Sequence, residues 1–448
     1  MLIDKLFQRL QTNTTKVAVV EQGKTYLYRD LIAATESWVQ KLDETVLETQ
    51  VVAVQSDFKF QSIALILALF RRGLVVALIS PSAKNIQTYC KDAQAEYLFS
   101  ASDAEDELTG AKLHCVSDKK HALLNELQLR KHAGFIIFSS GTTGRPKAIL
   151  HDLEQFLTSY TNVQKAFCTL SFLLLDHIAG LDTLFYTLSS GGSLALPDAR
   201  TPTAVCKLIS DCQVEVLPVS PSFLNLLLLS AEYQNYDLSS LKIVSYGSEP
   251  INSNVLKRLP DLFPQARIIQ KYGTSEFGSP RSKTREDDSA WMKLDSTNFK
   301  TKIVDGILWV KAQSTMLGYL NAEGMLEKDG WLCTGDLVEV EGGWMRIIGR
   351  KSDIINVGGE KVFPIEVESV INELTDVIDS MVYGIPHPML GNQVCIKVFY
   401  AKGIDSKSLK KAIRQRCLKE LERYKVPTKF EFVTETLTNN REKKQRCY

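Results

Sequence analysis

Short apolar runs recur between about residues 131 and 278, with longer helical patterns between them. Each run is short enough to be a buried strand, and the runs cover residues 134–138, 214–219, 243–246 and 267–270. Residues 223–231 form one of the helical patterns that separate them. Buried strands that alternate with helices are typical of a parallel sheet with helices on its faces. The sequence therefore predicts an α/β core.

The texture of the sequence changes after this core. Residues 300–350 hold short strand patterns and turn signals, as in 306–311 and 341–348, which are typical of β-hairpins. Mixed helix and strand patterns follow Arg350 to the end of the 448-residue chain. We therefore expect an α/β fold whose large N-terminal domain, residues 1–351, has mixed sheets, helices and a small β region. A small mobile α+β domain would comprise residues 352–448.

Composition excludes several classes of protein. Hydrophobic residues make up 44% and charged residues 23%, which is typical of a soluble globular protein. The formal net charge of +1 provides no global field for nucleic acid, so no nucleic-acid partner is expected. The nine cysteines are scattered singly, and the closest pair is Cys206 and Cys212. This spacing indicates neither a CxxC metal site nor a disulfide framework, and it favours a reducing cytoplasm.

We expect neither an export signal nor a membrane span. Residues 1–10 interleave charges with apolar residues, as an amphipathic helix does. The most apolar stretch, residues 63–70, meets Arg71 and Arg72 well before the roughly 20 residues that a bilayer requires. A buried helix followed by a strand fits this stretch.

A loop rich in glycine and hydroxyl groups, Ser139–Lys147, directly follows the predicted strand 134–138. Its glycines would let the backbone approach a polyphosphate, its hydroxyls can donate to phosphate oxygens, and Lys147 adds positive charge. It is not a Walker loop, because only two residues separate Gly141 from Gly144 and Ala148 follows the lysine. Kinase or GTPase chemistry is therefore disfavoured. Taken alone, such a cluster is also typical of a plain turn.

Three further segments accompany this loop in a fixed order: Tyr272–Glu276, Gly330–Asp336 and Gly349–Lys361. Together the four segments resemble the adenylate-forming superfamily, the AMP-binding family of acyl-CoA synthetases and stand-alone adenylation enzymes. The resemblance covers nearly the whole chain. The chain departs from the family pattern at Ala148, where glycine is usual, and at Ser275, which replaces a threonine and keeps its hydroxyl.

The resemblance implies a site for ATP and Mg²⁺. Glu276, a hard oxygen ligand, would hold the metal. Tyr272 would stack on adenine, with residues 247–250 on the other side of the base. Asp336 would accept hydrogen bonds from the ribose hydroxyls, and Arg350 would contact the same end of the nucleotide. The implied ATP-binding residues are Ser139, Ser140, Gly141, Thr142, Thr143, Gly144, Lys147, Gly247, Ser248, Glu249, Tyr272, Gly273, Asp336 and Arg350.

The resemblance also implies catalytic positions. Ser275 and Glu276 belong to them, and His177 would border the acyl pocket and gate the carboxylate or thiol. A carboxylate is already ionised at neutral pH, so we assign His177 no general-base role. The family lysine that bridges acid and phosphate oxygens corresponds to Lys443, three residues before Arg446, although Glu442 replaces the usual glycine. Lys444 is the alternative for this lysine.

The implied second step depends on a domain rotation. Ser352 lies at the hinge, where the family commonly carries Asp or Lys. The loop of Gly358, Gly359 and Glu360 would then enter the site and line a channel for the thiol.

The expected function is ATP-dependent activation of an aromatic or medium aliphatic carboxylic acid to an acyl-adenylate, followed by thioester formation. The acceptor thiol belongs to CoA or to the phosphopantetheine of a carrier protein. Three alternatives stay open: an enzyme that loads only a carrier protein, a binding protein without turnover, and an unrelated phosphotransferase that produces ADP. The departures at Ala148, Ser352 and Glu442 motivate the binding-protein alternative.

Overall fold

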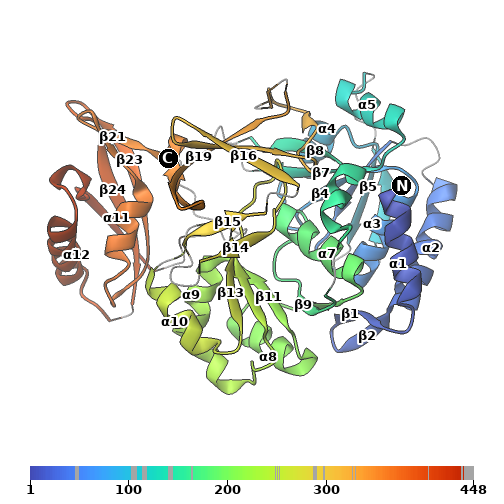
Figure 1. Cartoon of the computed structure of the whole chain (residues 1–448), viewed down its shortest axis with the longest axis horizontal. Helices are drawn as coiled ribbons and strands as arrows, with labels where there is room; N and C mark the ends of the chain where they lie inside the picture. Colours follow the sequence, from blue (N-terminus) through green and yellow to red (C-terminus); the bar gives the residue numbers. More distant parts are fainter. Residues whose placement is uncertain are drawn as a thin grey trace.

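The architecture was analysed in a computed structural model of the chain (Figure 1). It describes residues 1–45, 50–101, 108–113, 119–139, 145–162, 165–247, 249, 251, 253–285, 290–295, 298–324, 326–327, 329–401, 403–434 and 437. Within these ranges the strands form two seven-stranded sheets, one six-stranded sheet and one five-stranded sheet. Helices pack on the sheets, so the expected α/β class is confirmed.

The first seven-stranded sheet is parallel except at its β1–β2 edge. Its order is β13 (Arg267–Gln270), β12 (Ile243–Tyr246), β11 (Val216–Val219), β9 (Cys168–Leu170), β10 (Ser193–Leu196), β1 (Val17–Glu21) and β2 (Lys24–Leu27). One core cluster joins this sheet to α8 (Pro202–Cys212), α9 (Pro221–Ser230) and α10 (Ser253–Leu262). The predicted strands at 214–219, 243–246 and 267–270 therefore lie side by side.

The second seven-stranded sheet has parallel inner strands and antiparallel outer ones. Its order is β18 (Gly318–Tyr319), β8 (Lys147–Asp152), β7 (Gly134–Ser139), β4 (Val75–Ile79), β3 (Val51–Gln55), β5 (Tyr97–Ala101) and β6 (Leu108–Lys112). Residues of α4 (Ile86–Ala93) and α5 (Ala122–Arg130) pack on one face of it.

The largest core lies between these two sheets. It is filled by α1 (Leu2–Thr12), α2 (Tyr28–Thr45), α3 (Phe60–Arg71), α6 (Leu153–Leu157) and α7 (Ile178–Ser190). Residues 63–70 belong to α3 and are at most 1% exposed, and β4 follows, as predicted. Each such large apolar side chain contributes roughly 1.5–3 kcal/mol through burial. Among the described helices, none is both long and apolar enough to cross a membrane.

The six-stranded sheet is antiparallel and contains both predicted hairpins. Its order is β14 (Ser282–Thr284), β15 (Met292–Leu294), β20 (Trp344–Arg350), β19 (Leu332–Glu341), β17 (Ile307–Ala312) and β16 (Phe299–Val304). Short 3₁₀ turns elsewhere in the chain are η1 (Thr158–Tyr160), η2 (Glu232–Asn235), η3 (Lys351–Asp353) and η4 (Arg423–Lys425).

The C-terminal region has a sheet and a core cluster of its own. Its elements are β21 (Ile355–Val357), β22 (Glu360–Val362), α11 (Pro364–Ile371), β23 (Val377–His387), β24 (Gly391–Tyr400), α12 (Ser406–Glu420) and β25 (Lys429–Val433). Asn225 Nδ2 in α9 donates to Ile378 O in β23 at 2.7 Å, which joins this region to the rest. The boundary between residues 351 and 352 stays a prediction.

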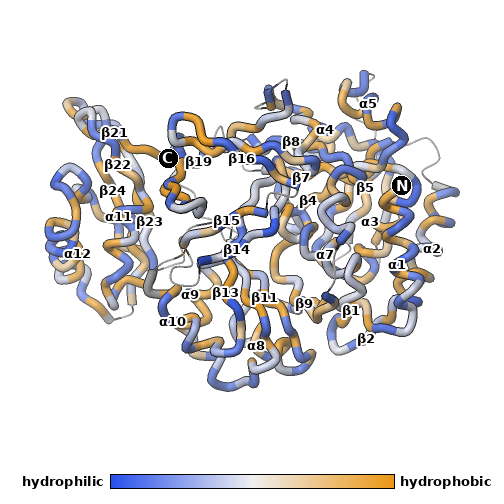
Figure 2. Tube along the Cα trace, in the orientation of Figure 1, coloured by the Kyte–Doolittle hydropathy of each residue, from blue (hydrophilic) through white to orange (hydrophobic). Residues whose placement is uncertain are grey.

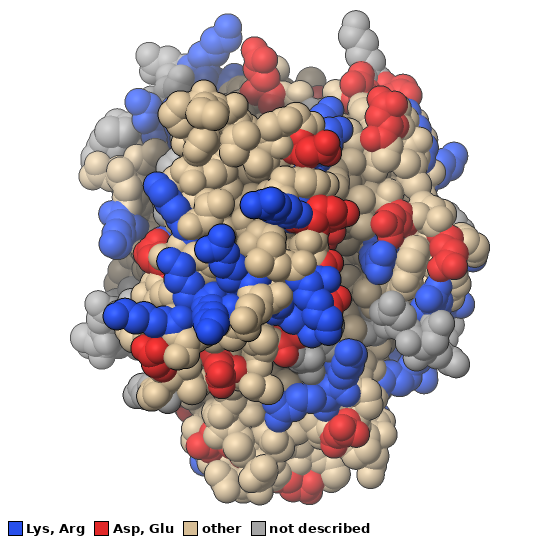
Figure 3. Space-filling model, turned by 90° about the vertical axis from the view of Figure 1, so that its left-hand side faces the viewer, with Lys and Arg blue, Asp and Glu red and all other residues tan. Residues whose placement is uncertain are grey.

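Helix α12 is amphipathic and carries the charge of this region on its outer face. Leu409, Ile413 and Cys417 are buried at helical spacing. Figure 2 shows hydrophilic residues dominating the rest of the helix, and Figure 3 shows Lys and Arg gathered across this end of the molecule. Nine basic and two acidic residues lie between Ser406 and Lys429, so a net charge near zero coexists with a basic face.

Candidate active site

The predicted phosphate loop leaves the carboxyl end of a parallel strand. Ser139 ends β7 and pairs with Lys147, the first residue of β8, so both ends of the loop belong to one ladder. Ser140, Gly141, Thr142, Thr143 and Gly144 lie outside the described residues. In open α/β sheets, ligands bind beyond the carboxyl ends of the strands, which is where this loop lies. In the described part of the chain the loop is followed by a strand and not by a helix, so no helix N-terminus faces the phosphates here. Phosphate binding would therefore rely on the loop itself and Lys147.

The other sheet brings two more predicted segments to its carboxyl edge. Parallel strands β12 and β13 end at Tyr246 and Gln270, so Gly247 and Lys271 lie side by side. A Cβ atom at Gly247 would be 2.5 Å from Lys271 O, which explains the glycine. Ser248 is outside the described residues, whereas Glu249 Oε1 accepts from Ser222 N at 2.9 Å. The 247–249 turn is thereby held against the start of α9.

Tyr272, Asp336 and Arg350 form one polar cluster. Tyr272 Oη donates to Asp336 Oδ2 at 2.7 Å, and Arg350 Nε donates to Asp336 Oδ1 at 2.8 Å. Burial and the adjacent Asp336 raise the pKa of Tyr272 well above its usual value, so its hydroxyl keeps its proton. Each carboxylate oxygen has a second lone pair, with which Asp336 can accept from a ribose hydroxyl. The structure thus brings together three residues that the sequence assigned to the nucleotide.

Glu276 meets the phosphate loop through Tyr319. Tyr319 Oη donates to Glu276 Oε1 at 3.0 Å, while Lys147 Nζ lies 4.8 Å from the centre of the same ring. The backbone of Glu276 is held at both ends, because its N–H donates to Thr274 Oγ1 at 3.2 Å and its carbonyl accepts from Met316 N at 2.6 Å. A cation and a carboxylate thus flank one aromatic ring.

Sequence reasoning missed Tyr319. It lies in the two-residue strand β18, which pairs with β8. A strand of this length leaves no periodic signal in the sequence.

Sequence reasoning also missed His151, a buried histidine behind Ser275. Its ring is 1% exposed and stacks on Phe135, with ring centres 4.7 Å apart. His151 Nε2 is 2.7 Å from Ser275 O. Burial lowers the pKa of His151 to about 4. The imidazole is therefore neutral at pH 7, and the bond to a carbonyl assigns the proton to Nε2. His151 thus ties the strand after the phosphate loop to the 272–276 segment.

His177 caps the start of α7 and is half-buried. The segment before it is held by Asp57, whose Oδ1 accepts from Leu175 N at 3.3 Å and whose Oδ2 pairs with Arg200 at 2.7 Å. His177 therefore has a defined position at a helix start, and its role at the acyl pocket stays a prediction.

Of the predicted C-terminal residues, Ser352, Gly358 and Gly359 lie in exposed turns. Ser352 is part of η3, and its Oγ donates to Asp353 Oδ1 at 2.9 Å. Gly358 and Gly359, with φ of +60° and +93°, form the tight turn between β21 and β22, and Glu360 begins β22. Lys443 and Lys444 lie outside the described residues. Hinge, thiol loop and lysine all stay predictions.

Comparison with known proteins places this geometry in a family. The model of the AMP-binding enzyme family matches residues 6–320, and that of the AMP-binding enzyme C-terminal domain matches residues 366–444. The first match alone covers more than half of the chain. The β19–β20 hairpin, which holds Asp336 and Arg350, lies in the interval between the two matches.

Relatives and solved structures with the same fold are numerous. Acyl-CoA synthetase 7 of Caenorhabditis elegans is 30% identical over 68% of this chain, which spans only 62% of that protein. The 2-succinylbenzoate–CoA ligase of Bacillus pumilus is 27% identical over 98% of this chain and 96% of its own length. The anthranilate CoA ligase AuaEII, solved with anthranoyl-AMP, has a TM-score of 0.83 at 20% identity, covering 99% of this chain and 95% of its own.

Proposed function

The chain belongs to the AMP-binding enzyme family, and from this premise we propose that it activates a carboxylic acid with ATP and transfers the acyl group to a pantetheine thiol. The observation that carries the proposal is that Tyr319 contacts both groups, with its hydroxyl on Glu276 and its ring under Lys147. This arrangement supports the roles that we propose for the two residues, with Lys147 on a phosphate and Glu276 on the metal. The names of the relatives, which are CoA ligases and an acyl-CoA synthetase, support the same chemistry.

In the first half-reaction, a carboxylate oxygen of the acid attacks the α-phosphorus of ATP. The bond from the α-phosphorus to the bridging oxygen breaks, and pyrophosphate leaves with the electron pair. Lys147 and the 139–147 loop would stabilise the charge on the phosphates, which is preorganised electrostatic catalysis. Tyr272, Asp336 and Arg350 would hold the nucleoside, and Lys443 would bridge acid and phosphate oxygens.

The residues at Glu276 fit Mg²⁺ that is shared with the nucleotide. Glu276 Oε1 accepts from Tyr319, and the described residues offer Oε2 no hydrogen-bond partner. The described part of the chain contains no group of three His, Cys, Asp or Glu side chains that could hold a metal alone. Mg²⁺ usually binds through one or two carboxylates plus substrate phosphates. When bound, the ion would neutralise phosphate charge.

In the second half-reaction, the thiol sulfur attacks the acyl carbonyl of the adenylate. The carbonyl-to-phosphate oxygen bond breaks, AMP leaves, and the thiol proton passes to solvent. We propose that rotation about Ser352 exchanges Lys443 for the turn of Gly358, Gly359 and Glu360. Such a hinge lets one site serve two reactions.

For the acid, we propose an aromatic or medium aliphatic substrate bound near His177, and CoA or a carrier protein as acceptor. Support comes from the apolar segments 175–186 and 218–224 and from relatives named for aromatic acids. A charged amino acid would be left unpaired among apolar side chains.

Carboxylate-dependent exchange of labelled pyrophosphate into ATP tests the proposal. We expect exchange with one class in a panel of aryl, short, medium and long acids, and an acyl-CoA mass or a loaded carrier after acceptor addition. Glu276→Gln should lower exchange about 100-fold, whereas Glu341→Gln, in an exposed pair with Arg285, should not change it. ADP as product, or ATP binding without exchange, would contradict the proposal and favour a phosphotransferase or a binding protein respectively.

A further inference from the structure

Asn321 follows Tyr319, the site residue of β18, by two positions, and its side-chain amide bonds to the backbone at the end of the phosphate loop. Its Oδ1 accepts from Ala148 N at 2.8 Å, and its Nδ2 donates to Pro146 O at 2.9 Å. A backbone hydrogen bond joins the same two segments, because Leu320 N donates to Ala148 O at 2.9 Å. One side chain thus holds the backbone on both sides of Lys147.

A second anchor reaches the loop from α4. The Asp92 side chain is 6% exposed, and its Oδ2 accepts from Asn321 Nδ2 at 2.9 Å. Arg145 Nε donates to the same oxygen at 3.2 Å, and its Nη2 contacts Oδ1. Residues 145, 146 and 148 are therefore tied to two elements that lie far from the loop in sequence.

These bonds determine where Lys147 can be. A flexible loop would lose conformational freedom when it closes on a polyphosphate, and that loss weakens binding. A loop end that is already held does not incur this loss, so its lysine is in place before the nucleotide arrives. Tyr319, two residues before Asn321, meets both Lys147 and Glu276. The segment 319–321 therefore sets the spacing of the loop lysine from the proposed metal ligand.

We propose that Asn321, supported by Asp92, is a positioning residue that presets the phosphate loop for the triphosphate of ATP. The inference rests on the proposed function and adds a residue that touches neither acid nor nucleotide. Its effect should be confined to the step in which a triphosphate is bound. Thioester formation from a supplied acyl-adenylate uses no β- or γ-phosphate and should not depend on Asn321.

The test compares the two half-reactions in full-length Asn321→Ala. We expect the KM for ATP in pyrophosphate exchange to rise at least about tenfold, the equivalent of roughly one or two lost hydrogen bonds. The KM for the acid and the rate of thioester formation from supplied acyl-adenylate should stay within about twofold of wild type. Asn321→Asp, which keeps the acceptor for Ala148 N but faces Asp92, should be at least as impaired.

Gln50→Ala is the matched control. Gln50 Nε2 also donates to a backbone carbonyl, Leu124 O at 2.7 Å, but it precedes β3 at the amino end of the same sheet. The Gln50→Ala variant should have an unchanged KM for ATP, even if its melting temperature falls. Equal loss of both half-reactions in Asn321→Ala, or a lower melting temperature with an unchanged KM for ATP, would overturn the proposal.

Two further measurements keep the outcome decisive. If Asn321→Ala does not fold, Asp92→Asn removes the charge that holds Arg145 and should raise the KM for ATP in the same selective way. If wild type shows no exchange with any acid, the proposed function fails, and the Kd for ATP by equilibrium dialysis takes the place of KM. A Kd that is about tenfold weaker in Asn321→Ala then supports the positioning role, and an unchanged Kd refutes it.

Discussion

Tyr319 contacts both charged groups of the proposed site through a single ring. Tyr319→Phe removes only the hydroxyl that donates to Glu276. We predict that this variant needs about three- to tenfold more Mg²⁺ for half-maximal pyrophosphate exchange, because the carboxylate loses a hydrogen bond that holds it in place. Titration of exchange with Mg²⁺ at saturating ATP measures this effect. Tyr26→Phe, in the distant strand β2, should leave the titration unchanged. An identical Mg²⁺ titration in both variants would show that Tyr319 does not position Glu276.

His151 makes stability depend on pH. Its pKa is about 4 in the folded protein and about 6.5 in an unfolded chain, so below pH 6.5 the unfolded state binds a proton that the folded state does not. Stability should therefore fall as the pH is lowered from 6.5 to 4, by about 3 kcal/mol from this group. Urea unfolding at pH 7 and pH 5 measures the part of this loss above pH 5, about 2 kcal/mol, which should shrink in His151→Gln. Phe135→Leu keeps the titrating group under an apolar side chain, so most of the loss should remain.

Gly273 is a position where the backbone leaves no space for a side chain. A Cβ atom there would lie 2.4 Å from Gly278 O, across the turn that presents Glu276. We expect Gly273→Ala to lower the free energy of unfolding by about 1–3 kcal/mol, as overpacking does, and to impair exchange. Gly324→Ala, whose new methyl group would be 3.8 Å from Leu326 N, should be tolerated. Equal unfolding free energies for the two variants would contradict this reading of the turn.

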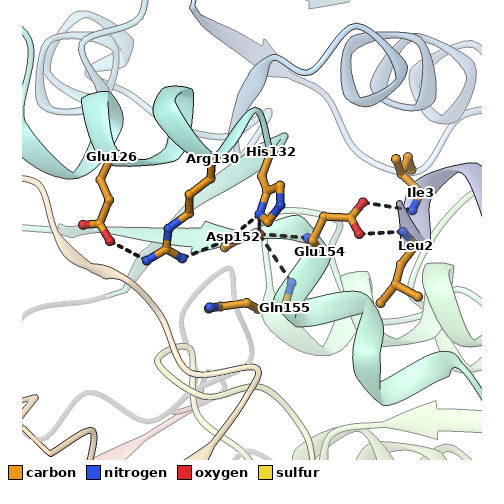
Figure 4. A network of polar contacts seen from close by, with 8 residues as sticks. All are labelled: Leu2, Ile3, Glu126, Arg130, His132, Asp152, Glu154 and Gln155. Atoms are coloured by element: carbon orange, nitrogen blue, oxygen red, sulfur yellow. Dashed lines mark hydrogen bonds and ion pairs between the residues drawn. The ribbon is translucent and has the colours of Figure 1, made fainter.

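At the scale of elements, strand β8 connects the site to the helices behind it. Asp152, the last residue of β8, accepts from Glu154 N at 3.0 Å and caps α6, while Glu154 Oε1 accepts from Ile3 N at 3.1 Å (Figure 4). The Asp152 side chain is fully buried and pairs with Arg130 at 3.2 Å and His132 at 2.9 Å. The Asp152 carboxylate thus joins α5, α6 and β8, and the Glu154 carboxylate joins α6 to α1.

We predict that Asp152→Ala destabilises the protein by about 2–4 kcal/mol, because it removes the cap of α6 and the hydrogen bonds of a buried carboxylate to Arg130 and His132. Chemical denaturation measures this loss. Asp211→Ala breaks only an exposed pair with Lys207 on α8 and should produce no measurable change. If the two variants unfold at the same denaturant concentration, the network in Figure 4 does not stabilise the fold.

At the scale of the whole molecule, Asn225 joins the C-terminal region to the core through Ile378 O. Asn225→Ala should loosen this junction and speed limited proteolysis around residues 350–354, where the exposed η3 turn connects the two. Asn235→Ala, in the neighbouring η2 turn, removes only a local contact with Glu232 and should leave the cleavage rate as in wild type. An unchanged rate in Asn225→Ala would mean that other contacts hold the region.

The distribution of charge over the surface is also a property of the whole molecule. The sequence has 53 basic and 52 acidic residues, which excludes a strong overall field. Folding nevertheless puts Lys407, Lys411 and Arg414 on the exposed side of α12, where no described residue forms an ion pair with them. Charge totals are properties of composition, whereas a charged face depends on which side of a helix packs.

The four core strands at 134–138, 214–219, 243–246 and 267–270 and the loop after the first of them were readable in the sequence, because periodicity and loop composition are properties of neighbouring residues. The order of the four motifs was matched through the family resemblance. The family resemblance assigned Tyr272, Asp336 and Arg350 to the nucleotide, but their contact with one another depends on tertiary structure, because Asp336 lies inside β19 and bonds to residues of two other segments. The roles of His151, Tyr319 and Asn321 could not be predicted from the sequence. Tyr319 reaches the site by pairing with Ile149, whereas His151 and Asn321 reach it through hydrogen bonds to Ser275 and Ala148, and each of these contacts joins segments more than 100 residues apart. Their roles depend on which neighbours folding brings within hydrogen-bond distance, and no local pattern encodes that choice.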